Sequence, residues 1–506
     1  MQNNIEQFIL VCLDSSLDHL VDHLEQFRRL ISCVQHFNDA NSCMDYITNI
    51  KNETVLLIIS VEHTQIIPFV YHIQQIYSIY IFNFNQCEKI SEETLNYRKV
   101  RGHFDTIDKL VKQIAYDKKW IASNLLTINS FPACTLGSYD MSDHINNNNI
   151  QEATFMYSQI LRSIFVNETY KDIDKNEMIE FFRQQYNENE TELEKINKFD
   201  REYTTERAIY WYTIDGFLYR TINKALRTQN ILTLYHLRYF IKDLHLELKK
   251  YHSKQSSNLS KETLIVYRGI GLPNDEFEKL KQGHLISFSE FLSTSKNREL
   301  AEIYVQRGFD DMQSILFEIE LNYTIQSSTP FADISEQSQF DLEEEILLSM
   351  GSVFRIQSLT LTSDNNWNIK LMQTSDEDQQ LKLLYQWLDQ AIFRVNHLYT
   401  KLSSLMLFIY DYDKAEFFLR KVVSQPGFNQ DIETISATSS IFGEIYFHQK
   451  KYEYAVMLYQ KTIELFEQHP DKSVPSTIQR CYTGLSEIYL EKEQYMKGMN
   501  ETKSLV

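Results

Sequence analysis

The chain has 506 residues and a net charge of −19, from 50 Lys and Arg against 69 Asp and Glu. At the usual size of roughly 100–200 residues for each domain, this length predicts about three domains. With only 12 Gly and 7 Pro, helices should outnumber tight turns, and collagen-like, linker-like and Pro-rich architectures are excluded. Because neutralising phosphates requires stripes of Lys and Arg, the acidic balance argues against a protein that coats nucleic acid or an anionic membrane.

The cysteines and the N-terminus carry no special signal. The six cysteines form no Cys-x-x-Cys pair and no cysteine–histidine spacing typical of a metal site, so we expect free thiols and no metal. The first seven residues hold no Lys or Arg, and the apolar run at 8–13 is shorter than a signal-peptide core. No segment approaches the ~18–20 apolar residues that a membrane-spanning helix needs. We therefore expect a cytoplasmic protein.

Residues 1–120 alternate short apolar runs with helical patterns. Strand-like runs and amphipathic stretches follow one another at 8–13, 17–31, 54–60, 66–77, 79–82 and 107–114. Continuous β-branched and aromatic runs separated by helices are typical of a parallel sheet that is covered on both faces. We predict a small flavodoxin-like or receiver-like α/β module. Asp14 follows the first strand, where a receiver would keep an acidic residue, but a carboxylate there is more often a helix cap.

The next part of the chain changes from helical to β-rich patterning. Periodicity is lost over 121–150, where a run of asparagines favours a linker. Apolar residues then recur at three- and four-residue spacing over 151–252, which predicts a helical lobe. A β-rich core follows over 262–360 and stops near Asn366. We interpret 151–365 as one domain, made of the helical lobe and the β core.

From 376 to 506 the chain is helical again, and it repeats itself. Tyr412-Asp413-Lys414-Ala415 returns as Tyr452-Glu453-Tyr454-Ala455, and Gly443-Glu444-Ile445-Tyr446 returns as Ser486-Glu487-Ile488-Tyr489. A small residue in one helix lets a bulky one from its partner pack closely, and the recurring Tyr fills the groove between helices. These segments resemble tetratricopeptide repeats of the longer, kinesin-light-chain-like kind. They imply a surface for an unknown protein ligand.

Several catalytic motifs are missing. The chain has no G-x-x-x-x-G-K-[ST], no H-E-x-x-H and no G-x-S-x-G, so a nucleoside triphosphatase, a zincin and a serine hydrolase have no support. Gly269-Ile270-Gly271 follows a predicted strand. However, Asn274 stands where a dinucleotide-binding turn needs its third glycine, and Pro273 interrupts that turn.

Three motifs in the β core carry groups that suit chemistry on a bound pyrophosphate. Arg268 ends one predicted strand, Ser293 lies in a Phe-Leu-Ser-Thr-Ser run after another, and Glu343 and Glu345 enter a third. Arginine offers phosphate oxygens a planar, permanently charged fork, and serine hydroxyls can donate to a ribose. On a strand, the two glutamates would point to one face. Two carboxylates with divided roles suit glycosyl chemistry, in which positive charge develops on the sugar.

The order of these motifs resembles the Arg-Ser-Glu class of mono-ADP-ribosyltransferases, in particular the arginine-specific branch with its Glu-x-Glu motif. The resemblance covers about residues 200–360. It also includes Tyr212-Thr213, 223–227, 333–335 with Ser338 and Phe340, and 351–356. It implies an α+β ADP-ribosyltransferase fold that uses NAD as co-substrate and no metal.

The resemblance also implies a role for each matching residue. Arg268 would contact the NAD phosphates or the adjacent ribose, and the backbone at Gly269 would contact the nicotinamide amide. Ser293 would order the site by hydrogen bonding to NAD or to the catalytic glutamate. Glu345 would hold the nicotinamide ribose and stabilise the charge that develops as nicotinamide leaves. Glu343 would orient and deprotonate an acceptor guanidinium.

The acceptor side of the predicted site is less sharply defined. The segment 331–342 corresponds to the acceptor-recognition loop of the family, with Phe340 as an acceptor contact. Glu344 makes the triplet all acidic, and the Ile-Leu that follows favours Glu345 as its second carboxylate. Other Glu-x-Glu triplets occur, and the one at Glu318 and Glu320 also lies on a predicted strand, where we expect a solvated face.

The sequence therefore predicts an NAD-dependent protein-arginine mono-ADP-ribosyltransferase. Its partners would be a protein with an accessible arginine and an unknown protein ligand on the repeats, with no nucleic acid and no membrane. Two alternatives stay open. One is a transferase-like scaffold, weak or inactive in catalysis, that acts through its repeats, and the other is an enzyme dominated by NAD hydrolysis.

Overall fold

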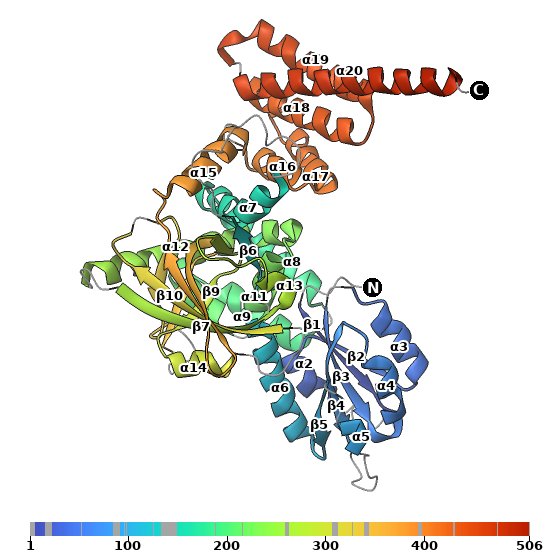
Figure 1. Ribbon diagram of the computed structural model, residues 1–506, viewed down its shortest axis with the longest axis vertical. Coiled ribbons are helices and arrows are strands. Elements are labelled where there is room, and N and C mark those ends of the chain that lie inside the picture. Colours follow the sequence, from blue (N-terminus) through green and yellow to red (C-terminus); the bar gives the residue numbers. More distant parts are fainter. Residues whose placement is uncertain are drawn as a thin grey trace.

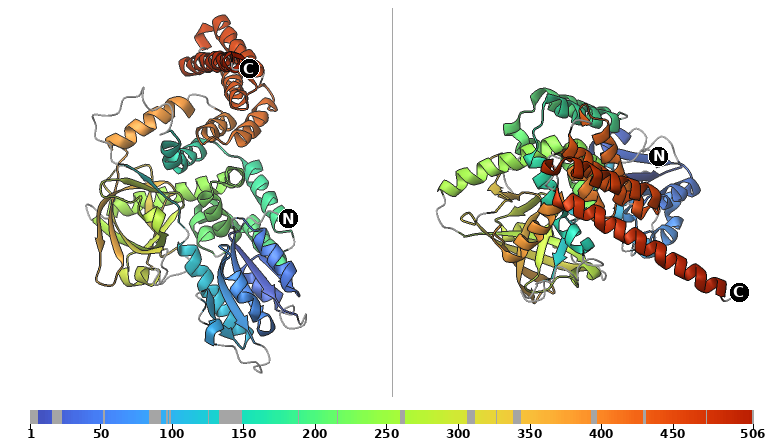
Figure 2. Two further views of the ribbon diagram at one scale, coloured as in Figure 1. Left: turned by 45° about the vertical axis from the view of Figure 1, so that its right-hand side comes forward. Right: turned by 90° about the horizontal axis from the view of Figure 1, so that it is seen from above.

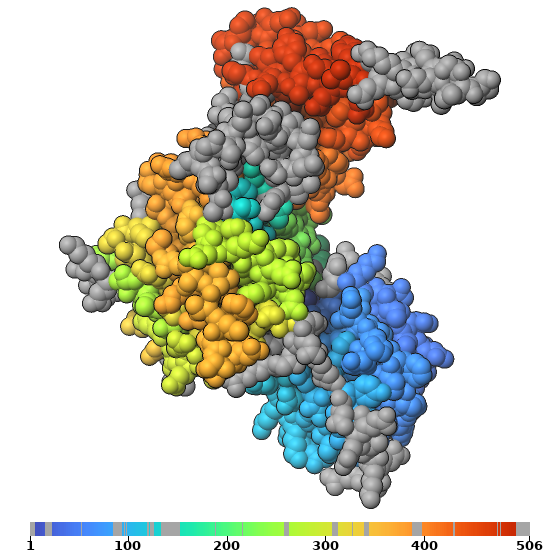
Figure 3. Space-filling model, viewed as in Figure 1, coloured from blue at the N-terminus to red at the C-terminus, as the bar shows by residue number. Residues whose placement is uncertain are grey.

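The computed structural model has three regions that follow one another along its long axis (Figures 1 and 2). In the space-filling view, the N-terminal module lies against a central region, and the C-terminal helices lie at the opposite end (Figure 3). The structure describes residues 6–15, 23–51, 53–83, 92–95, 97, 99–124, 126–132, 149–187, 189–214, 216–258, 263–305, 312–325, 327–337, 344–392, 397–428, 431–472 and 474–504.

The described residues of the N-terminal module form a five-stranded sheet whose neighbouring strands are all parallel. The strands are β1 (Phe8–Leu13), β2 (Cys33–Phe37), β3 (Thr54–Ser60), β4 (Ile76–Phe82) and β5 (Val100–Phe104). Their order, β2-β1-β3-β4-β5, is that of flavodoxin-like folds, so the predicted fold class is confirmed. The third strand of the chain ends at Ser60, and the first carboxylate after it is Glu62.

Helices cover both faces of this sheet (Figure 1). They are α2 (Leu24–Leu30), α3 (Ala40–Thr48), η1 (Val61–Ile66), α4 (Ile67–Val70), α5 (Glu92–Leu95) and α6 (Ile107–Asn124). Alternate residues of β1 join the cores on opposite faces, which is why the inner strands are continuous apolar runs. The edge strands β2 and β5 are half-buried and carry polar residues, so the sequence pattern missed them. The helix expected over 66–77 is shorter, because β4 begins at Ile76.

The helical lobe of the central region packs six helical elements around one aromatic-rich core. These are α7 (Asn149–Asn167), α8 (Asp172–Gln185), α9 (Glu190–Glu202), α10 (Ala208–Thr213), α11 (Phe217–Arg227) and α12 (Ile231–Asn258), with η2 (Thr205–Arg207) before α10. Phe182, Phe199 and Phe240 are among its fully buried side chains. The predicted three- and four-residue spacing of apolar residues reflects these helix faces.

The described residues of the β core form a curled mixed sheet of nine strands in the order β11-β12-β9-β7-β10-β14-β13-β8-β6. The strands are β6 (Ile128–Phe131), β7 (Thr263–Pro273), β8 (Leu285–Phe288), β9 (Leu292–Ser295), β10 (Met312–Asn322), β11 (Phe331–Asp333), β12 (Glu345–Leu348), β13 (Ser352–Leu361) and β14 (Trp367–Gln373). Two short helices, α13 (Asn274–Phe277) and α14 (Arg298–Ile303), accompany it. Among the described strands of this nine-stranded sheet, only the β10–β14 pair is parallel.

Two strands of this sheet lie where the sequence predicted none. β6 falls within 121–150, the segment expected to be a linker, and pairs with β8 at the sheet edge. β14 follows the point near Asn366 where the β-rich pattern was expected to stop, yet it lies between β10 and β13. A four-residue edge strand has too little periodicity to stand out, and β14 alternates buried residues with polar ones such as Lys370. Both expectations are corrected by the sheet.

The C-terminal region consists of helical hairpins. Its elements are α15 (Gln379–Ile392), α16 (Leu398–Phe408), α17 (Tyr412–Val423), α18 (Ile432–His448), α19 (Tyr452–Gln468), η4 (Pro470–Lys472) and α20 (Pro475–Ser504). The hairpin of α16 and α17 shares its hydrophobic core with the helical lobe, and α16 contacts α7. No helix in the described ranges combines the length and the apolar character needed to cross a membrane.

Candidate active site

The three motifs predicted from the sequence lie on three neighbouring strands of the sheet. β9, which carries Ser293, lies between β12, which begins at Glu345, and β7, which carries Arg268. Ser295 pairs with Glu345 on one side and with Tyr267 on the other. Segments far apart in the sequence are therefore brought together by the order of the strands.

A cavity of about 390 Å³ opens beside these strands. Arg268, Gly269, Ser293 and Glu345 all line it, so the four predicted residues that the structure describes share one site. The register of the acidic triplet is also visible. Glu345 faces the cavity and is half-buried, whereas the side chain of Glu344 is exposed. Glu344 has a left-handed backbone conformation with φ 41°, which turns the chain immediately before β12.

Gly269 is required by the close approach of α14 to β7. A Cβ atom at Gly269 would lie 2.0 Å from the backbone oxygen of Ala301 and 3.0 Å from Val305. Ala301 also lines the cavity, beside Leu300 and Tyr304. A larger residue at 269 would therefore push the α14 segment away from the strand that carries Arg268.

The helical lobe forms a second wall of the cavity. Tyr212 and Thr213 end α10, and Asn223 and Arg227 lie on α11, so two of the four additional pieces that match the family belong to this wall. The Tyr212 hydroxyl donates to Asn223 Oδ1 at 3.0 Å, and its ring lies 5.5 Å from the ring of Phe291. These contacts link the lobe to the segment that leads into Ser293.

Glu290 is a cavity residue that the sequence reasoning missed. It lies between β8 and β9, is 2% exposed and accepts a hydrogen bond from the Thr127 backbone N–H at 3.2 Å. Burial raises the pKa of Glu290 to about 7, although the nearby guanidinium groups of Arg227 and Arg268 oppose this rise. Its position next to Phe291 of the Phe-Leu-Ser-Thr-Ser motif was visible, but no sequence pattern marks a carboxyl group as buried.

A third wall comes from the N-terminal module. Its residues precede Arg268 in sequence by at least 150 positions, and they are Gln7, Phe8, Leu30, Ala115 and Lys118. The sequence predicts this module as a separate α/β unit, and none of the predicted site residues lies in it. Nothing in a single sequence signals that two domains share a cavity, because that depends on how they pack.

The charges that line the cavity suit an anionic ligand. Four cationic side chains, Lys118, Arg220, Arg227 and Arg268, face two carboxyl groups, Glu290 and Glu345, among the described residues. Aromatic side chains such as Tyr212, Tyr219 and Phe291 supply flat apolar surface beside them. A mostly apolar cavity with a few convergent polar groups is typical of small-molecule sites. In the described ranges, no group of three His, Cys, Asp or Glu residues could hold a metal ion.

Two predicted residues, Glu343 and Phe340, lie outside the described residues. The described part of the expected acceptor loop is held by Asp333, which pairs with Lys296 and accepts from the Ser335 hydroxyl at 2.7 Å.

The competing Glu-x-Glu triplet, at Glu318 and Glu320, lies away from the cavity. Glu318 pairs with Lys370 at 3.1 Å, Glu320 is exposed, and neither lines the cavity.

Comparison with known proteins bears on the central region. Residues 139–379 match the model of the NAD:arginine ADP-ribosyltransferase family, a range that includes the 200–360 segment of the resemblance. The repeats expected in the C-terminal helices are not confirmed by a family match, and no curated protein matches the chain. The chain thus contains an ADP-ribosyltransferase domain in residues 139–379.

Solved structures of ADP-ribosyltransferases are similar to part of the chain. The Vis toxin from Vibrio splendidus is 19% identical over 43% of this chain and 92% of its own, with a TM-score of 0.25. HopU1 of Pseudomonas syringae is 22% identical over 43% of this chain and 96% of its own, with a TM-score of 0.27. The C3 exoenzyme of Clostridium limosum is 18% identical over 34% of this chain and 86% of its own, with a TM-score of 0.26.

Proposed function

We propose that this protein is an NAD-dependent protein-arginine mono-ADP-ribosyltransferase, which transfers ADP-ribose from NAD to an arginine side chain and releases nicotinamide. The observation that carries the proposal is the convergence of Arg268, Ser293 and Glu345, from three neighbouring strands, on one cavity. The family match supports transfer of ADP-ribose. Arginine as the acceptor is supported by the name of that family and by the Glu-x-Glu motif.

The residues of the cavity fit a dinucleotide in charge and in shape. A pyrophosphate carries two negative charges, and Lys118, Arg227 and Arg268 bring positive charge to the cavity. The fourth cation of the lining, Arg220, is paired with Glu6 and Glu192. The Arg268 guanidinium can donate to two phosphate oxygens at once. The ring of Tyr212 or Phe291 offers a flat apolar face to an aromatic base.

In the proposed reaction, the bond between the ribose and nicotinamide breaks, and a bond from the same ribose carbon to a guanidinium nitrogen of the acceptor forms. Glu345 stabilises the positive charge that develops on the sugar, because a fixed carboxylate favours that charge more in the transition state than in the ground state. Glu343 accepts the proton that the guanidinium loses. The Ser293 hydroxyl holds the ribose or Glu345 in position.

We also propose that the C-terminal helices are tetratricopeptide-like repeats that bind a protein ligand. The proposed domain limits follow the sequence analysis, with 1–120, 151–365 and 376–506 as the three units. The central unit gains β6 before its start and β14 after its end, since both strands pair within its sheet.

The proposal is tested by incubating the purified full-length protein with labelled NAD and a mixed protein lysate. The wild type is compared with Glu345→Gln and Glu343→Gln, and modified side chains are mapped by mass spectrometry. Label on arginine that both variants lose supports the proposal. Free ADP-ribose without labelled protein would favour an NAD hydrolase, and no nicotinamide release with any acceptor tried would favour the inactive scaffold.

A further inference from the structure

The N-terminal module contributes a wall to the cavity although it lies outside the region that matches ADP-ribosyltransferases. Gln7 and Phe8 lie at the start of β1, Leu30 ends α2, and Ala115 and Lys118 lie on α6. All of them precede residue 139, where the family match begins. α6 contacts β7, the strand that carries Arg268. The cavity is therefore completed by a module that the family match does not include.

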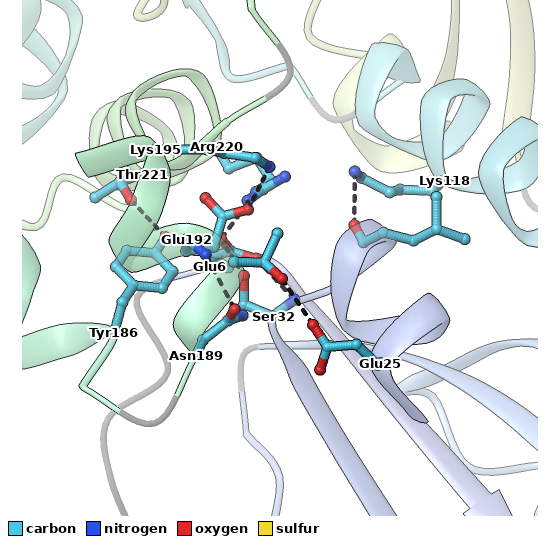
Figure 4. A network of polar contacts seen from close by, with 12 residues as sticks. Glu6, Glu25, Ser32, Lys118, Tyr186, Asn189, Glu192, Lys195, Arg220 and Thr221 are labelled. Carbon is cyan, nitrogen blue, oxygen red and sulfur yellow. Dashed lines mark hydrogen bonds and ion pairs between the residues drawn. The ribbon is translucent and has the colours of Figure 1, made fainter. Parts of the chain in front are cut away.

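A buried ionic network fixes the module against the helical lobe (Figure 4). At its centre is Glu6, which is 1% exposed and accepts from Arg220 Nε at 2.8 Å and from the Tyr186 hydroxyl at 2.6 Å. Ser32, from the module itself, donates to the same carboxylate at 2.8 Å. Burial alone would raise the pKa of Glu6, but Arg220 and these two hydroxyl donors hold it below its ordinary value.

Further bonds join the same two parts of the chain. Lys224 Nζ donates to the backbone oxygen of Glu6 at 2.8 Å and pairs with Glu53 at 3.1 Å. Arg227 Nη2 donates to Gln7 Oε1 at 2.9 Å. A buried charge is tolerated when it is paired and hydrogen-bonded, and removing one partner costs several kcal/mol. Because Arg220, Arg227 and Gln7 also line the cavity, the contacts that dock the module also shape the site.

Lys118 is the cationic residue that this wall brings to the cavity. Lys118 is only 6% exposed, and its Nζ donates to the Leu30 backbone oxygen at 2.8 Å. It also interacts electrostatically with Glu6. An ammonium group has three N–H donors, and Lys118 lines the same cavity as Arg268. Because Lys118 is largely shielded from solvent, its charge attracts an anion more strongly than it would at the surface.

We propose that Lys118 contacts an anionic group of the dinucleotide, so that the N-terminal module is part of the co-substrate site. This inference rests on the proposed function, because it takes NAD as the ligand. The alternative is that Lys118 only holds the Leu30 backbone in place. In that case the affinity for NAD would not depend on the charge of Lys118.

The test measures the dissociation constant of NAD for the full-length protein by calorimetry, at several salt concentrations. Lys118→Met keeps the apolar stem of the side chain and removes the charge. Lys112→Met is the matched control, since Lys112 is exposed on the same helix. We expect Lys118→Met to weaken NAD binding about tenfold, as loss of a charged hydrogen bond does. It should also make the dissociation constant less sensitive to salt, with Lys112→Met matching the wild type.

The possible results separate this inference from the function on which it rests. A wild type that binds NAD and two variants that bind it equally well would overturn the inference and leave the proposed function standing. Weaker binding by Lys118→Met with an unchanged salt dependence would show that Lys118 acts only by holding Leu30, and would also overturn it. A wild type that binds no NAD would overturn both.

Discussion

Arg268 and Glu345 lie on strands that are separated in the sheet by β9 alone, and both side chains line one cavity. β9 supplies Ser293 to the same cavity and pairs with both neighbours through Ser295. The rigid ladder therefore fixes the spacing between a group that suits phosphates and a group that suits a developing positive charge. Preorganisation of this kind is what electrostatic catalysis requires.

We predict that Glu345→Gln lowers the rate of NAD cleavage by roughly 10²–10³-fold, as loss of one transition-state contact does. The NAD dissociation constant should change by only a few-fold, because the amide keeps the size and the hydrogen-bonding capacity of the side chain. Nicotinamide release and calorimetric titration measure the two quantities. Glu344→Gln is the control, since Glu344 is adjacent but exposed. Equal losses in the two variants would contradict a specific role for Glu345.

We predict that Gly269→Ala destabilises the central region by about 1–3 kcal/mol, the usual cost of inserting an atom into a closely packed site. The added Cβ would lie 2.0 Å from the Ala301 backbone oxygen, so the α14 segment must move. This movement should also weaken NAD binding, because Leu300 and Ala301 of α14 line the cavity. Thermal unfolding is compared with that of Gly216→Ala, where the new Cβ meets its nearest neighbour at 3.7 Å. A Gly269 variant as stable as the Gly216 variant would show that α14 yields without cost.

Glu290 should make stability depend on pH. Burial raises its pKa from 4.5 to about 7 in the folded protein. Between these values the folded state holds a proton that the unfolded chain has released, so stability falls as pH rises through this window and levels off above about pH 7. Glu290→Gln removes this contribution, which amounts to at most on the order of 3 kcal/mol. The Gln variant should therefore lose less stability than the wild type between pH 5 and pH 8.

The control for this prediction is Glu299→Gln, because Glu299 is exposed on α14. Unfolding midpoints in urea at pH 5, 6.5 and 8 measure the effect. Parallel pH profiles for the wild type and Glu290→Gln would mean that Glu290 stays ionised throughout, held so by Arg227 and Arg268.

Site residues that stand in local sequence motifs could be predicted, and those placed only by tertiary packing could not. Arg268 and Glu345 stand in local motifs on predicted strands, and Ser293 stands in a Phe-Leu-Ser-Thr-Ser run that was predicted to follow a strand. The sequence therefore indicated all three without any knowledge of the strand order. β6 and β14 were missed because an edge strand and an alternating strand give weak local signals. Glu290 and Lys118 were missed for a different reason. A buried carboxyl group and a lysine from another module acquire their place in the site only through tertiary packing, which no local pattern records.

The C-terminal helices pack closely around the side chain of Tyr459. The Tyr459 ring of α19 lies between Gly443 of α18 and Gly484 of α20, and a Cβ at either glycine would come within 2.5 Å of that ring. We predict that Gly484→Ala destabilises these helices by about 1–3 kcal/mol, because the ring cannot move away from both neighbours. Thermal unfolding of the full-length protein measures the change in stability. Hydrogen exchange of the amides in α18–α20 shows whether the change lies in these helices.

The sign of this effect should reverse when the ring is absent. In a Tyr459→Ala background, the added methyl group enters the space that the ring has left, and Ala is favoured over Gly within a helix by up to about 1 kcal/mol. Gly484→Ala should therefore stabilise that background, although Tyr459→Ala itself costs several kcal/mol. Such a reversal is a direct measure of coupling between the two positions. If Gly484→Ala costs the same in both backgrounds, the close contact between Tyr459 and Gly484 does not determine how these helices pack.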